Sequence, residues 1–329
     1  MIKLIQIGLG PLGQKIVRFI AARKNIKIVA AIEIDPDKVG KDLGKLCSLP
    51  SMGVLVSNDL VFELKDKNPD VAIISTASSL SKVKIQIEEI AKKGVNIIST
   101  CEEMAYPWKT QFQLAKQIDE ICKKHNVVCV GTGVNPGFLM DYLPCVLSTA
   151  CQKVEKVTVS RFQDASNRRI PFQRKIGAGL TIEQFREKEK QGVLRHLGLV
   201  ESINMIAKCM GWKLDNITEN LNPIIAEQKI ITDNITIDKA YASGVEQIGK
   251  GFVGNKEVIC LNFRASIGEN NPVDRIEISG IPNIKSEIQG GINGDIATCS
   301  ITINTIKSIL SASPGLKTML DLPNTGFFF

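Results

Sequence analysis

Gly8-Leu9-Gly10-Pro11-Leu12-Gly13 lies near the start of this 329-residue chain, between an apolar run over residues 3–8 and a helical stripe of apolar residues. The GxGxxG spacing is typical of a turn that binds the pyrophosphate of a dinucleotide. Its first glycine permits the tight turn, its second leaves room for the pyrophosphate, and its third lets the helix pack closely against the strand. The helix that begins at Pro11 and Leu12 offers free N–H groups to the phosphates. The stretch therefore predicts a dinucleotide site.

An acidic residue follows at the end of the second predicted strand. Glu33 lies twenty residues past Gly13, where a carboxylate can accept both hydroxyls of the adenosine ribose. A carboxylate there repels a 2′-phosphate, so the sequence favours NAD over NADP. Lys38 and Lys41 follow in the next loop, and use of both cofactors therefore stays open.

Strand and helix patterns alternate through residues 1–140. Asn58 or Asp59 is expected to cap one helix, and Pro107 to begin another that ends near residue 124. Such alternation predicts a parallel sheet covered on both faces, so we expect a Rossmann dinucleotide-binding domain over residues 1–140. Apolar runs place its strands near residues 3–8, 26–33, 54–56, 71–75, 95–99 and 127–130.

The pattern changes after Pro144, and we expect an α+β substrate-binding domain over residues 141–329. Runs separated by Gly, Asn and Pro turns predict an open, largely antiparallel sheet. The C-terminal helix and tail, from about residue 294, are expected to pack back on the first domain. Phe327-Phe328-Phe329 is expected to make a domain or subunit contact. The predicted strands cover residues 154–162, 245–252, 257–267, 274–278 and 285–288, and helices cover residues 182–190 and 199–210.

Composition excludes several classes of protein. Hydrophobic residues make up 44% and charged residues 23% of the chain, as in ordinary globular domains. The net charge is +7, but the cations are scattered and aromatic residues make up only 5%, which argues against nucleic-acid binding. No apolar run is long enough to cross a membrane, and no His/Cys/Asp cluster has metal-ligand spacing. The start leaves no room for a signal peptide, and nine cysteines without a CxxC pair indicate reduced thiols, so we expect a cytoplasmic protein.

Polar residues follow two of the predicted strands and the last strand of the sheet. Ligands of open parallel sheets bind beyond the carboxyl ends of the strands. Ser75, Thr76 and Ala77 end one strand and Thr100 ends the next, so we expect all four at the cofactor. Asn135 and Gly137, in the loop after the last strand, are expected beside the nicotinamide.

Two neighbouring glutamates, Glu102 and Glu103, are the candidate catalytic carboxylates. Each fits the spacing of a capping box, Glu102 with Ser99 and Glu103 with Thr100. Two alternatives stay open, because either glutamate can cap the helix while the other faces the substrate. Asp141, farther along the chain, is a weaker candidate carboxylate.

Several stretches resemble the 2,4-diaminopentanoate dehydrogenase family. They are Ser99-Thr100-Cys101-Glu102-Glu103-Met104 and residues 131–138, 291–298 and 313–323. The wider fold resembles dihydrodipicolinate reductase and the native amine dehydrogenases. The resemblance implies NAD(P)-dependent oxidative deamination of the C4 amine of 2,4-diaminopentanoate, giving 2-amino-4-oxopentanoate and ammonia. It also implies a homodimer, formed through the second domain, and a role in ornithine fermentation.

The diamino acid implied by this resemblance carries a carboxylate that needs a fixed cation. A planar guanidinium is the best partner for a carboxylate. The second domain offers a basic stretch from Arg168 to Lys175, and the residues cannot be ranked from sequence. The candidate substrate-binding residues are Arg161, Arg169, Phe172, Arg174, Lys175 and His196.

Three alternative functions remain beside this one: a general amine dehydrogenase, a dihydrodipicolinate reductase-like reductase, and an NAD-binding sensor or scaffold without turnover. The reductase is disfavoured because it carries a histidine-rich substrate motif, whereas this chain has only two separated histidines. His125 follows two lysines at a predicted helix end, where a cation suits the helix dipole, and we expect a structural role for it.

Overall fold

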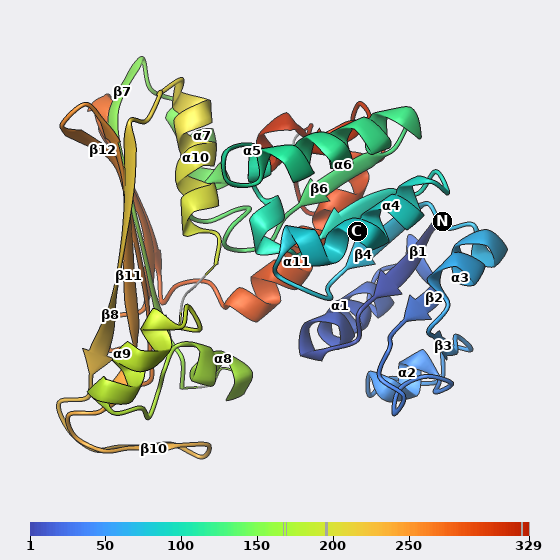
Figure 1. The fold of residues 1–329 in the computed structure, drawn as a ribbon, viewed down its shortest axis with the longest axis horizontal. Coiled ribbons are helices and arrows are strands. Elements are labelled where there is room, and N and C mark those ends of the chain that lie inside the picture. Colours follow the sequence, from blue (N-terminus) through green and yellow to red (C-terminus); the bar gives the residue numbers. More distant parts are fainter. Residues whose placement is uncertain (167, 169, 195–196, 324, 329) are drawn as a thin grey trace. The chain divides into compact units, whose positions relative to one another are not determined.

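Residues 1–166, 168, 170–194, 197–323 and 325–328 are described by the computed structural model of the chain. They divide into two units (Figure 1). The first unit combines Met1–Phe138 with Asn293–Phe329, and the second comprises Leu139–Ile292. The chain therefore enters the second unit once and returns to the first.

A parallel sheet forms the centre of the first unit, in the order β15-β6-β5-β4-β1-β2-β3. Its strands are buried from both sides, and Leu4, Ile5 and Ile73 have no accessible surface. This is the doubly covered parallel sheet that alternating strands and helices predict. The strands are β1 (Ile2–Ile7), β2 (Ile26–Ile32), β3 (Val56–Ser57), β4 (Val71–Ile74), β5 (Asn96–Ser99), β6 (Val128–Gly131) and β15 (Gly315–Lys317).

Two pairs of helices pack against this sheet. The helix α1 contacts α11, and α4 contacts α6. The helix α1 buries Ile16, Val17 and Ile20, which recur at helical spacing. The helical segments of this unit are α1 (Pro11–Ala21), α2 (Leu43–Leu46), α3 (Leu60–Lys67), α4 (Leu80–Ala91), η1 (Glu102–Met104), α5 (Pro107–Thr110), α6 (Phe112–Lys124), α11 (Gly294–Ile309) and η2 (Met319–Asp321).

The local signals for helix ends are partly confirmed. Asp59 caps α3, since its carboxylate accepts from Phe62 N at 2.9 Å. Pro107 does begin a helix, but the prediction of one helix to residue 124 is wrong, because the chain leaves helical geometry at Gln111. His125 lies at the C-terminal end of α6, where its N–H donates to the Ile121 carbonyl.

The second unit contains a six-stranded sheet in the order β14-β13-β7-β12-β11-β8. The pairs are antiparallel except β7 with β12, which run parallel, so the sheet is mixed rather than purely antiparallel. The sequence analysis does not predict β8, because half of its residues are polar and all of them are at least partly exposed. The strands are β7 (Lys153–Asp164), β8 (Asn216–Ile225), β11 (Ala242–Val253), β12 (Lys256–Ser266), β13 (Val273–Ile281) and β14 (Ile284–Gln289), with a separate ribbon of β9 (Ile230–Ile231) and β10 (Thr236–Ile237).

Two helices of the second unit, α7 (Tyr142–Ser148) and α10 (Leu199–Met210), pack against each other and against this sheet (Figure 1). Asp141 links them: its carboxylate accepts from Tyr142 N at 2.6 Å and from the Ser202 hydroxyl at 2.8 Å. Asp141 has no accessible surface, so it joins two helices rather than facing a solvent-filled site. Two further helices are α8 (Ile170–Lys175) and α9 (Ile182–Lys190).

The C-terminal tail lies against the first unit, to which it belongs. The Arg23 guanidinium lies 4.5 Å from the centre of the Phe327 ring, and Phe328 N donates to Asn304 Oδ1 at 3.2 Å. Phe329 lies outside the described residues. None of the described helices combines the length and the apolar character needed to cross a membrane.

Candidate active site

The glycine turn between β1 and α1 has no room for side chains at two positions. Gly8 has a φ of +88°, and a Cβ there would lie 2.9 Å from the Ser75 carbonyl oxygen. A Cβ at Gly13 would lie only 2.0 Å from the Gly8 carbonyl oxygen. Nothing lies within 4 Å of a Cβ built on Gly10, so this backbone stays open to a ligand. The turn fits the cradle that a pyrophosphate requires.

A pocket of about 250 Å³ opens beside this turn, within the first unit. Its wall combines backbone from the turn with side chains from the ends of β2 and β4 and from α4. The lining residues are Ile7, Gly8, Gly10, Ile32, Glu33, Ile34, Ser75, Thr76 and Gln86. Such a position, beyond the carboxyl ends of the strands, is where open parallel sheets bind ligands.

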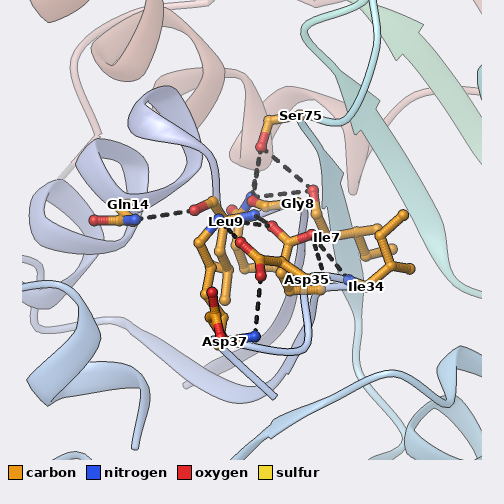
Figure 2. Close-up of polar contacts among 11 residues, drawn as sticks. Ile7, Gly8, Leu9, Gln14, Ile34, Asp35, Asp37 and Ser75 are labelled. Carbon is orange, nitrogen blue, oxygen red and sulfur yellow. Dashed lines mark hydrogen bonds and ion pairs between the residues drawn. The ribbon is translucent and has the colours of Figure 1, made fainter. Parts of the chain in front are cut away.

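Glu33 lies at the end of β2 and lines this pocket. Its Oε2 accepts from Leu9 N at 2.8 Å, and its Oε1 accepts from Ile34 N at 2.8 Å. Figure 2 shows Leu9 of the turn beside the loop that carries Ile34, Asp35 and Asp37. The carboxylate is thus fixed by backbone donors while its side chain keeps 13% of its surface exposed.

A lysine accompanies this carboxylate. Lys38 Nζ lies 3.0 Å from Asp35 Oδ2 and 3.8 Å from Glu33 Oε2. The hydrogen bond between Asp35 and Lys38 is the main cause that lowers the pKa of Asp35 and raises the pKa of Lys38. The cation that the sequence offers to a 2′-phosphate is therefore paired with the neighbouring carboxylate.

Glu103 lies just after β5, in the turn η1. Its Oε2 accepts from Leu80 N at 2.8 Å, Ser79 Oγ at 3.1 Å and Gln111 Nε2 at 3.2 Å. It therefore caps the N-terminus of α4, a helix that precedes it in the sequence. The capping-box hypothesis named the wrong helix, because spacing along the chain cannot show a partner brought close by the fold. Glu102 occupies the first position of η1 and is half-buried.

The other predicted cofactor residues also lie at the carboxyl ends of strands in the first unit. Thr76 is exposed after β4, and its hydroxyl donates to Gln86 Oε1 at 2.8 Å. Ala77 and Thr100 are half-buried, and Pro11 and Leu12 begin α1. Asn135 and Gly137 are buried in the loop after β6. Thr298 of α11 contacts this loop, since Val134 N donates to its hydroxyl at 3.3 Å.

Arg161, in β7 of the second unit, does not present its guanidinium to solvent. It is 1% exposed, and Nη1 lies 2.7 Å from Asp274 Oδ1. A second nitrogen, Nη2, donates to the Ile292 carbonyl at 3.0 Å. The guanidinium predicted as a partner for a substrate carboxylate is therefore already paired with a carboxylate of its own unit.

The predicted basic stretch follows β7 and includes α8. The Arg168 guanidinium lies 4.2 Å from the centre of the Phe172 ring. Arg174 is exposed, and Lys175 and Phe172 are half-buried. Arg169 and His196, both predicted substrate-binding residues, lie outside the described residues. Among the described residues, no group of three or more His, Cys, Asp or Glu side chains could hold a metal ion.

Sequence reasoning missed two glutamines at this site. Gln6 lies under the glycine turn, and its one signal in the sequence is that it interrupts the apolar residues of β1. Gln86 lines the pocket from α4. It lies on a helix with many polar residues, so nothing in the sequence singles it out.

Similarity to known proteins identifies the family of this chain. The 2,4-diaminopentanoate dehydrogenase C-terminal domain matches residues 138–327, and the N-terminal domain of dihydrodipicolinate reductase matches residues 2–130. A 2,4-diaminopentanoate dehydrogenase from Acetoanaerobium sticklandii is 31% identical, over 98% of this chain and 93% of the relative. The chain belongs to the 2,4-diaminopentanoate dehydrogenase family. The resemblance predicted from the sequence is confirmed, and the protein is an NAD(P)-dependent oxidoreductase.

Two further matches are a solved structure with a similar fold and a relative that covers less than half of the chain. The structure of an amine dehydrogenase from Mycobacterium smegmatis has a TM-score of 0.87 and 23% identity, covering 99% of this chain and 97% of that chain. A 4-hydroxy-tetrahydrodipicolinate reductase from Methanocaldococcus jannaschii is 31% identical, but only over 40% of this chain and 46% of the relative. The diaminopentanoate dehydrogenase relative therefore covers both units, whereas the N-terminal domain of dihydrodipicolinate reductase matches only residues 2–130, in the first unit.

Proposed function

We propose that this member of the diaminopentanoate dehydrogenase family oxidatively deaminates the C4 amine of 2,4-diaminopentanoate. The products are 2-amino-4-oxopentanoate, ammonia and reduced cofactor, with NAD favoured over NADP. The enzyme acts in the cytoplasm as a homodimer, in ornithine fermentation. The observation that carries the substrate is the 31% identity to a 2,4-diaminopentanoate dehydrogenase over almost the whole of both chains.

The residues of the first unit fit the nicotinamide cofactor. Its pyrophosphate would lie against the open backbone at Gly10, and its adenosine ribose would donate to the Glu33 carboxylate. Bound there, the cofactor supplies the hydride acceptor. Thr100, Asn135 and Gly137 lie in the segments after β5 and β6, where we expect the nicotinamide end.

The substrate's C4 ammonium must lose a proton before a hydride can leave the same carbon. Alkyl ammonium groups have a pKa of about 10, so a base has to assist this loss. Loss of the hydride from C4 then leaves an iminium, which is cationic. A nearby carboxylate stabilises this positive charge as it develops. Water then adds to the iminium carbon, and ammonia leaves.

We assign this carboxylate to Glu102. The three donors on Glu103 Oε2 support the choice, because they commit that side chain to the α4 terminus. Glu102 follows β5 at the same edge of the sheet and is half-buried, which strengthens its electrostatic effect on a neighbouring cation.

The α-carboxylate of the substrate would bind cations of the basic stretch in the second unit. Arg174 and Lys175 on α8, with Arg169 and His196, are the proposed partners, and Phe172 accompanies them. Arg161 is left out of this set because Asp274 already neutralises it at 2.7 Å.

The formation of NADH from NAD⁺ and racemic 2,4-diaminopentanoate tests the proposal. We expect turnover with the diamino acid and poor turnover of a plain 2-aminoalkane, because the cations that bind the carboxylate would then stay unpaired. Comparable activity on the plain amine would assign the chain to the general amine dehydrogenases. Cofactor binding without turnover of any amine would indicate a sensor, and sedimentation would measure the dimer.

The substitution Glu102→Gln tests the catalytic assignment. It keeps the shape of the side chain and removes its charge, so kcat should fall by about 10²–10⁴-fold while NAD⁺ affinity stays nearly constant. Glu103→Gln is the matched control, with an expected loss of about 1 kcal/mol in stability from the weakened cap. Unchanged kcat in Glu102→Gln would contradict the assignment.

A further inference from the structure

Gln6 is a polar side chain with no accessible surface in β1, an interior strand of the parallel sheet. Its Nε2 donates to the Gly8 carbonyl at 3.0 Å, to Ser75 Oγ at 2.9 Å and to the Ile7 carbonyl at 3.3 Å. Two of these three partners are carbonyl oxygens, which can only accept. The amide nitrogen must therefore face the glycine turn, because the amide oxygen would meet lone pairs there.

The oxygen of the same amide is left without a hydrogen bond. Within the described part of the chain, Gln6 Oε1 is buried and has no partner. An unsatisfied buried acceptor costs about 1–3 kcal/mol, and an apolar side chain of similar volume would avoid this cost. What Gln6 supplies to the protein is therefore its pair of N–H donors.

These donors act on one peptide group of the turn. The Gly8 carbonyl also accepts from Ser75 Oγ at 3.0 Å (Figure 2), so two side chains donate to this oxygen. The N–H of the same peptide belongs to Leu9 and donates to Glu33 Oε2 at 2.8 Å. The carbonyl and the N–H of a trans peptide point in opposite directions. The Gly8–Leu9 peptide is therefore held at both ends, by Gln6 and Ser75 on one side and by Glu33 on the other.

We propose that Gln6 is a positioning residue for cofactor selectivity. It fixes the plane of the Gly8–Leu9 peptide, and the Leu9 N–H then orients the Glu33 carboxylate toward the ribose hydroxyls. Gln6 thereby sets the preference for an unphosphorylated ribose without touching the cofactor. This inference rests on the proposed role of Glu33 as the ribose ligand.

Titration of the purified protein with NADH and with NADPH, followed by fluorescence, tests the inference without any amine substrate. In Gln6→Met we expect NADH affinity to fall about tenfold and NADPH affinity by less than about threefold, as loss of one oriented hydrogen bond implies. Gln247→Met is the matched control, since Gln247 is equally buried but lies in β11 of the second unit. It should lower the melting temperature and leave the ratio of the two affinities unchanged.

A double-mutant cycle with Glu33→Ala separates positioning from a general loss of stability. In the Glu33→Ala background, Gln6→Met should change NADH affinity by less than about threefold. The reason is that Gln6 acts on the ribose only through the Glu33 carboxylate, which this background lacks. If Gln6→Met fails to fold, Ser75→Ala removes the other side-chain donor to the same carbonyl and should shift the ratio in the same direction.

Two outcomes would contradict the positioning role of Gln6, and a third would contradict the proposed function. An unchanged ratio in a folded Gln6→Met or Ser75→Ala variant would overturn the positioning role. Fully additive losses in the double variant would do the same, since independent effects add. Failure of the unmodified protein to bind either cofactor would instead contradict the proposed function, which keeps the two failures distinguishable.

Discussion

Two polar clusters in this molecule, one in each unit, hold the backbone by different means. In the first unit, the neutral side chains Gln6 and Ser75 hold the Gly8 carbonyl. In the second unit, a pair of charges holds Ile292: its N–H donates to Asp274 Oδ2 at 2.7 Å, and its carbonyl accepts from Arg161 at 3.0 Å.

The two clusters also differ in how their charged side chains are surrounded. Glu33, the charge of the first cluster, lines a pocket and is steadied by backbone N–H groups rather than by a cation in close contact. In the second cluster, burial is the main influence on both groups, raising the pKa of Asp274 and lowering that of Arg161. The carboxylate that lines the pocket keeps some solvent exposure, whereas the carboxylate that accepts from the Ile292 backbone is neutralised by an arginine of its own unit.

The largest expected effect comes from breaking the charged cluster. Asp274→Ala leaves the Arg161 guanidinium buried and uncompensated, so the free energy of unfolding should fall by about 3–5 kcal/mol. Urea unfolding measures this loss. The double variant Arg161→Met/Asp274→Leu should recover most of it, because apolar side chains can replace a buried pair. A loss below about 1 kcal/mol in Asp274→Ala would show that the pair does not stabilise the unit.

A smaller effect is expected at the carboxylate that faces the pocket. Glu33→Ala should weaken NADH binding by about ten- to hundredfold, the equivalent of 1.5–3 kcal/mol for a charged hydrogen bond. NADPH binding should change far less, because the lost acceptor served only the unphosphorylated ribose. Calorimetric titration with both cofactors measures the two affinities. Equal losses would show that Glu33 is not the ribose ligand.

The smallest effect is expected at Asp35 and Lys38, the partly exposed ion pair beside Glu33. Asp35→Asn should release Lys38 and improve NADPH affinity by no more than about fivefold, as for other exposed ion pairs. Asp37→Asn, with the same change of charge two residues away, is the control and should improve it less.

The same pair predicts a pH dependence. The pKa of Asp35 lies below its ordinary value of 3.8, so the pair stabilises the folded protein above that pH and is lost as the pH falls through the lowered pKa. Carboxyl NMR should find this lowered pKa, and Lys38→Met should raise it toward the ordinary value, while the backbone hydrogen bond from Asp37 continues to lower it.

The fold, and the glycine turn with the pocket beside it, could be predicted largely from local patterns. The glycine turn, the residue at the end of β2 and the alternation of strands and helices all depend on neighbours in sequence. Glu103 and Arg161 show where such reasoning stops. The carboxylate of Glu103 accepts from Leu80, and Arg161 pairs with Asp274, partners that lie 23 and 113 residues away along the chain. Contacts of this kind are set by tertiary structure, and residue type and spacing carry no sign of them.

The return of the chain to the first unit has a consequence for biosynthesis. The strand β15 extends the nucleotide-binding sheet beside β6, and α11 packs against α1. Both elements follow the second unit in the sequence, so they are translated after it. Until then β6 is an unpaired edge and α1 lacks its neighbour, so the nascent first unit exposes apolar surface while the second unit is completed. Synthesis of the first unit therefore begins before the second unit and is completed after it.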